Sequence, residues 1–148
     1  MVMCEYFSAS DDDAAVRVLD QPGGPHRSAF DVVPLKGFDP VVVMACLEAI
    51  LTGCTDEEAS ERPRSGQLLS SPEAESAFVL SVSDSLQEAL ASASHTSLTD
   101  VAGRWAETDE LRQFGVAPET ALEALVQLGG LADRARSAGL RLFCWWAL

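Results

Sequence analysis

Among the side chains that could take part in acid–base or nucleophilic chemistry, three are candidates for a site assembled from distant parts of the chain: Tyr6, Glu48 and His95. Glu48 is the only charged residue in an apolar stretch over residues 41–51, so a pocket around it would supply a general acid or base. The alternative is that Glu48 lies on the one stripe of a helix that reaches solvent. The small alanines near it favour this alternative, and we expect Glu48 to be solvent-exposed.

The residues around His95 resemble the composition of a catalytic triad, because serines and Asp100 lie close to it in the sequence. Proximity in sequence does not produce triad geometry, which most folds assemble from distant segments. The sequence also lacks the G-x-S-x-G turn that exposes a nucleophilic serine. We therefore expect His95 to be an exposed loop residue, and the sequence predicts no catalytic residue.

Metal-ligating residues are few and poorly spaced. The four cysteines are scattered without a C-x-x-C pair, and there are only two histidines. The acidic run Asp11–Asp13 cannot converge on one ion, because consecutive helical side chains point about 100° apart. Its carboxylates instead complement the dipole of a helix that begins there. With no G-x-G-x-x-G and no Walker loop, the sequence predicts no metal and no cofactor.

Aromatic residues are the candidates for binding. The C-terminal segment LRLFCWWAL alternates, so that Phe143 and Trp145 point to one face of a strand and Trp146 to the other. A strand that is apolar on both faces belongs inside a sheet. If helices cover only one face, Phe143 or Trp145, with Tyr6 beside them, remains partly exposed and forms an interface. Trp105 lies among acidic residues that could form a binding rim, but we expect it to be a core residue at a helix end.

The charge balance limits the classes of partner. The net charge is −13, and the only lysine is Lys36. Nucleic-acid binding needs clustered basic residues, so a nucleic-acid partner is not expected. No apolar run approaches the roughly 20 residues that span a bilayer, and the first residues lack the basic region of a secretion signal. We expect a cytoplasmic protein without membrane contact, whose partner is a basic protein or a second copy of the chain.

Hydrophobic patterns predict one α+β domain over residues 1–148, with a single mixed sheet of about four strands and four to five helices packed against it. The N- and C-terminal strands are expected to pair. The clearest helix is capped by Asp39 and ends at Gly53, and the polar segment 52–66 after it is expected to be a mobile loop. The expected strands lie near residues 1–9, 29–35, 77–83 and 140–148.

The longest predicted helix covers residues 118–138 and has Gly129 and Gly130 in its interior. Glycine in a helix interior costs about 1 kcal/mol relative to alanine. This pair therefore predicts a bend or the close approach of another helix.

Several stretches together resemble the YfbM-like bacterial family of unknown function. MVMCEYF resembles its M-x-M-x-x-Y-F opening, and FDPVVVMACLEAILTG resembles its early helix, in which an acidic cap at Asp39 is followed by Leu-Thr-Gly at residues 51–53. The segment over residues 80–105 and the helix that runs into the last strand are similar too, whereas residues 52–76 depart from the pattern. The resemblance implies an α+β fold, and the family carries no established catalytic residues to transfer.

The lack of convergent catalytic groups and the acidity favour a non-enzymatic domain that binds a protein or a small molecule. An inhibitor or immunity-like protein that masks a basic partner belongs to this class. The alternative is a small hydrolase-like enzyme whose site combines distant residues such as Glu48, His95 and Tyr6.

Overall fold

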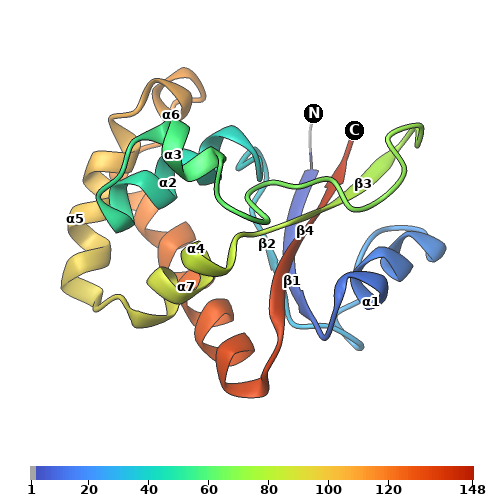
Figure 1. The fold of residues 1–148 in the computed structure, drawn as a ribbon. Helices are drawn as coiled ribbons and strands as arrows, with labels where there is room; N and C mark the ends of the chain where they lie inside the picture. The colour runs from blue at the N-terminus through green and yellow to red at the C-terminus, as the bar shows by residue number, and fades with distance from the viewer. Residues whose placement is uncertain (1–2) are drawn as a thin grey trace.

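The computed structural model describes residues 3–148, and a four-stranded sheet in the order β2-β1-β4-β3 lies between its helices (Figure 1). The terminal strands pair along their whole length, from Met3 opposite Ala147 to Ala9 opposite Arg141, which confirms the predicted pairing. Residues 1 and 2 of the predicted first strand lie outside the described residues. The strands are β1 (Met3–Ala9), β2 (Val32–Pro34), β3 (Ala77–Ser81) and β4 (Arg141–Ala147).

The α+β class and the four strands are confirmed, but every pairing is antiparallel, where a mixed sheet was expected. Parallel neighbours need a crossover connection. Here the connections from β1 to β2 and from β3 to β4 each return the chain beside the strand it left, in the opposite direction. β2 is an edge strand of three residues, and Pro34 is tolerated there because an edge strand needs fewer backbone donors.

The described residues form seven α-helices, more than the four to five expected, because three of them are single turns of five residues. None of these helices combines the length and apolarity needed to cross a bilayer. The helices are α1 (Asp12–Val16), α2 (Val42–Thr52), α3 (Asp56–Ser60), α4 (Asp84–Ser92), α5 (His95–Ala106), α6 (Asp109–Gln113) and α7 (Pro118–Ala138), and a 3₁₀-helix, η1 (Arg17–Asp20), follows α1.

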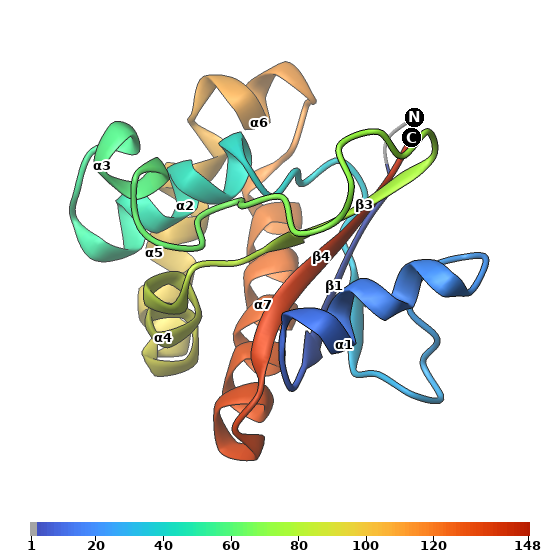
Figure 2. The ribbon, with the colours of Figure 1, turned by 45° about the vertical axis from the view of Figure 1, so that its right-hand side comes forward.

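Helices cover both faces of the sheet. The longer helices α2, α4, α5 and α7 gather on one face, and α1 with η1 covers the other (Figures 1 and 2). The predicted alternation of β4 is confirmed, since Leu142 and Cys144 join the larger core while Phe143 joins the smaller one under α1. Because both faces are covered, the condition under which Phe143 or Trp145 would lie on an open face of the sheet is not met.

The predicted end of α2 at Gly53 is confirmed, but the helix begins at Val42 with Val41 as its N-cap, two residues after the predicted cap at Asp39. The Asp39 carboxylate accepts hydrogen bonds from the backbone N–H groups of Val41 (2.9 Å) and Val42 (2.6 Å), and Gly53 ends the helix in the left-handed conformation at φ 74°. The segment 52–66, expected to be a loop, contains α3. Thr55 caps α3 with a capping box, and the mobility of the rest of the segment stays a prediction.

Of the two glycines inside α7, Gly129 lies against a neighbouring helix. A Cβ atom on Gly129 would lie 3.4 Å from the backbone oxygen of Leu90 in α4, whereas one on Gly130 would meet only Arg134 of α7 itself. The predicted approach of another helix is therefore confirmed at Gly129 and not at Gly130.

Candidate functional site

Glu48 is buried, with 1% of its surface exposed, so the predicted solvent-exposed position is wrong. The alanines beside it do not open a path to solvent. Ala45 and Ala49 instead form a small buried cluster with Ala59 of α3, because short side chains let α3 pack close against α2. The segment 52–66 folds back over the face of α2 on which Glu48 lies.

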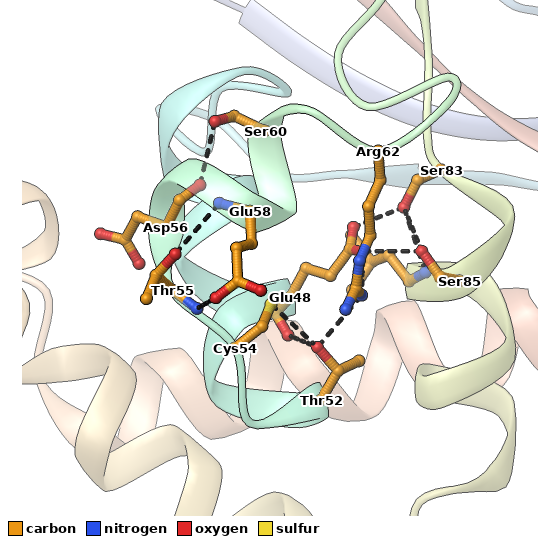
Figure 3. A network of polar contacts seen from close by, with 11 residues as sticks. Glu48, Thr52, Cys54, Thr55, Asp56, Glu58, Ser60, Arg62, Ser83 and Ser85 are labelled. Atoms are coloured by element: carbon orange, nitrogen blue, oxygen red, sulfur yellow. Dashed lines mark hydrogen bonds and ion pairs between the residues drawn. The ribbon is translucent and has the colours of Figure 1, made fainter.

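Three donors from other elements converge on the Glu48 carboxylate (Figure 3). Ser83 Oγ donates to Oε1 at 2.5 Å, and Ser85 Oγ donates to Oε2 at 2.6 Å. Arg62 Nη1 donates to Oε2 at 2.6 Å and also to Thr52 Oγ1 at 3.1 Å. The carboxylate therefore joins α2, the start of α4 and the chain after α3.

This hydrogen-bond network links elements of the fold and has a structural role. Ser83 Oγ also accepts the backbone N–H of Leu86 at 3.1 Å, so the same hydroxyl caps α4 and binds Glu48. Both carboxylate oxygens of Glu48 accept hydrogen bonds from protein donors. A general base needs an oxygen directed at its substrate's proton, and here the oxygens are directed at the fold's own donors.

Tyr6 and His95 do not join Glu48. Tyr6 is fully buried, its hydroxyl donates to the backbone oxygen of Phe38 at 2.5 Å, and burial raises the pKa of the phenol well above its ordinary value. His95 is exposed as predicted, but it is the first residue of α5 and not a loop residue. The enzyme alternative requires these three side chains in one site, and no hydrogen bond or ion pair between described residues links any two of them.

Two of the predicted aromatic contacts are core residues. Trp105 is fully buried, its Nε1 donates to the backbone oxygen of Val43 at 3.3 Å, and its ring lies 5.2 Å from that of Phe38, which confirms the expected core position. Phe143 is fully buried against Phe7, with ring centroids 5.8 Å apart. An exposed interface therefore cannot include Phe143, Trp105 or Tyr6, which is equally buried.

Trp145 is half-buried on the face of the sheet that α1 covers. The turn before β2 packs on its ring: a Cβ atom on Gly24 would lie 2.8 Å from Trp145 Cδ2. A hollow of about 490 Å³ opens beside the ring, between Leu19 and Leu148. Trp145 is thus the one predicted interface aromatic that keeps an exposed surface.

A larger cavity, of about 960 Å³, opens at the N-terminal end of α2, and we call it the α2 groove. Val41, Val42 and Phe114 remain 39%, 50% and 66% exposed there, which is unusual for large apolar side chains gathered in one place. Its lining is Lys36, Gly37, Phe38, Asp39, Val41, Val42, Phe114, Val116 and Trp146.

Three separate segments build the α2 groove. The hydrogen bond from Tyr6 to Phe38 and the bond from the Leu35 N–H to the Cys4 oxygen (2.8 Å) hold residues 35–39 against β1. Phe114 and Val116 come from the turn between α6 and α7, and Trp146 from the end of β4. The sequence did not predict this site, because its only local sign is a pair of valines, Val41 and Val42, at the start of a helix.

The polar groups of the α2 groove differ in how they are satisfied. The Asp39 carboxylate already accepts backbone N–H groups of α2. Lys36 is exposed and takes part in none of the ion pairs found within residues 3–148. Trp146 Nε1 is buried and has no hydrogen-bond acceptor among the described residues. Of the two charged side chains that line the groove, Lys36 is therefore the one without a counterpart in this part of the chain.

Within residues 3–148, no three His, Cys, Asp or Glu side chains lie close enough together to hold a metal ion. Comparison of the chain with protein-family models, with curated proteins and with solved structures gave no match.

Proposed function

We propose that this protein is a non-enzymatic binding domain that takes up a small apolar molecule in the α2 groove. The observation that carries the proposal is the groove itself, whose volume of about 960 Å³ falls at the upper end of the range typical of small-molecule sites. Such sites are mostly apolar with a few polar groups, and six of the nine lining residues here are valine, phenylalanine or tryptophan.

The exposed apolar side chains supply the free energy for binding. Covering apolar surface contributes about 25 cal/mol per Å², and Val42 and Phe114 have more than a third of their surface open to water. Val42 is the first residue of α2, and Phe114 follows the last residue of α6. The β-branched side chain of Val42 has few rotamers in a helix, so little side-chain entropy is lost when a ligand covers it.

Binding of a protein remains a second candidate because Trp145 is half-exposed on the opposite side of the sheet. A basic partner that matches the net charge of −13, as an inhibitor or immunity-like role would require, or a second copy of the chain would cover this ring. The resemblance to the YfbM-like family and the cytoplasmic location also stay predictions, and neither supplies a ligand.

The proposal is tested with 1-N-phenylnaphthylamine, a neutral apolar dye that fluoresces when it leaves water. We expect saturable binding to one site, and at least about tenfold weaker binding to Val42→Asp, because a carboxylate in the groove must be desolvated by the dye. Asp at the first residue of α2 complements the helix dipole, so this variant should fold.

The matched control is Val126→Asp, which introduces the same charge at a valine of α7 that is 45% exposed and lies outside the α2 groove. It should bind the dye as the unmodified protein does. Equal affinity of the two variants, or no saturable binding at all, would show that the groove is not a ligand site.

A further inference from the structure

We infer that the ligand of the α2 groove is an apolar acid, an alkyl or aryl chain that ends in one carboxylate, and that Lys36 pairs with this carboxylate. The inference rests on the proposed function and adds the chemical class of the ligand to it. It is carried by Lys36, which lines a mostly apolar cavity and pairs with no acidic side chain within residues 3–148.

Two charged side chains line the groove, and only one of them lacks a counterpart. Asp39 accepts hydrogen bonds from Val41, Val42 and Val43, at 2.9, 2.6 and 3.4 Å, and so faces the positive end of the α2 dipole. Lys36, the only lysine of the chain, has no acidic partner within 4.0 Å in the described residues. The uncompensated charge at the groove is therefore positive.

The ammonium group of Lys36 requires an acceptor, and a carboxylate has two acceptor oxygens. A charge-assisted pair between the two is stronger than a hydrogen bond to a neutral hydroxyl. A cationic ligand would offer Lys36 no acceptor and would place like charges together there.

The net charge of −13 opposes the approach of any anion, but over a longer range. At physiological ionic strength, interactions between exposed charges are largely screened beyond about 8 Å. A carboxylate in contact with the Lys36 ammonium lies well within that distance. The local pair then determines affinity, and the overall charge lowers the rate of association.

The test compares three ligands with the same ten-carbon chain, namely decanoate, decanol and decylammonium, by displacement of 1-N-phenylnaphthylamine at physiological ionic strength. We expect decanoate to bind about five- to tenfold more tightly than decanol, and decylammonium to bind most weakly. Lys36→Gln should remove the preference for decanoate and leave decanol unchanged. Lys36→Arg should restore it, because the positive charge is kept.

Arg104→Gln is the matched control, since it also removes one exposed positive charge from the chain but lies on α5 and not in the groove. It should bind all three ligands as the unmodified protein does.

The outcomes separate the two proposals. If neither the dye nor any ten-carbon ligand binds, the proposed function fails and the ligand class fails with it. If decanol binds as tightly as decanoate, if Lys36→Gln leaves decanoate affinity unchanged, or if decylammonium binds most tightly, the apolar-acid assignment is overturned while the groove remains a binding site.

Discussion

Glu48→Gln tests whether the buried carboxylate stabilises the fold through its hydrogen bonds. The substitution preserves shape and volume but removes the charge and replaces one acceptor oxygen with an amide donor. Ser83 and Ser85 donate to Glu48 at 2.5 and 2.6 Å, and a hydrogen bond to a charged acceptor contributes about 1 kcal/mol or more beyond a neutral one. Whichever way the new amide is oriented, its NH₂ group replaces one of the two carboxylate oxygens. The donors that bound that oxygen then face another donor.

The two serine hydrogen bonds predict a loss of about 2–3 kcal/mol in the free energy of unfolding. Arg62 adds nothing to this figure, because its side chain is 30% exposed and regains water when the carboxylate is lost. For a chain of this length the loss corresponds to a decrease in Tm of about 5–10 °C. Urea unfolding, followed by far-ultraviolet circular dichroism, measures it with the slope m expected to stay constant.

Glu88→Gln is a closely matched control. Glu88 also accepts hydrogen bonds from a serine and an arginine, Ser92 at 3.0 Å and Arg136 at 2.9 Å, but its side chain is 62% exposed. Exposed pairs contribute about 0–1 kcal/mol, so this variant should unfold almost as the unmodified protein does. If Glu48→Gln loses no more stability than Glu88→Gln, or gains stability, the carboxylate does not hold α2 and α4 together and the reasoning is refuted.

Three further measurements follow from the buried core and the turn over Trp145. Tyr6 is the only tyrosine, and burial raises the pKa of its phenol. We therefore expect the near-ultraviolet signal of tyrosinate to be absent at about pH 10 and to appear only as the chain unfolds. Reversible ionisation at that pH in the folded protein would contradict the burial of Tyr6. Burial, reinforced by nearby carboxylates, raises the pKa of Cys46 to about 12, so only about one Cys46 thiol in 10⁴ is ionised at pH 8. Iodoacetamide should therefore label the half-exposed Cys54 before Cys46. Equal labelling rates of the two cysteines, measured by mass spectrometry, would contradict this expectation. Gly24→Ala should lower the free energy of unfolding by about 1–3 kcal/mol more than Gly23→Ala does. Both glycines have φ near +87° to +88°, but only a Cβ atom at Gly24 would meet Trp145. Equal losses of stability in urea unfolding would show that the turn does not pack on the Trp145 ring.

Much of the fold could be predicted because its signals are local. Asp39 accepts backbone N–H groups at the start of α2 from residues within four positions of it, and Gly53 ends the helix because glycine adopts the left-handed conformation. The alternation of β4 follows from the geometry of a single strand. The pairing of the termini was also accessible. A strand that is apolar on both faces must lie inside a sheet, and the last segment of the chain has this pattern.

The two candidate sites were not accessible in this way. Glu48 has the same neighbours in sequence whether it reaches solvent or not, and its burial depends on the docking of α3 on Ala45 and Ala49. The number of covered sheet faces likewise depended on α1, a helix of five residues whose contribution the composition does not reveal.

The sequence by itself thus determined the class of the fold, the main helix boundaries and the two-faced C-terminal strand, because these depend on hydrogen bonds and side-chain directions within one segment. Only the tertiary structure decided that Glu48 is buried among hydrogen-bond donors and that an apolar groove exists, lined by a lysine that is unpaired within residues 3–148. Residues 36–42, 114–116 and 146 meet at that groove. Contacts between segments so far apart depend on how whole elements pack, and no local pattern of residues encodes them.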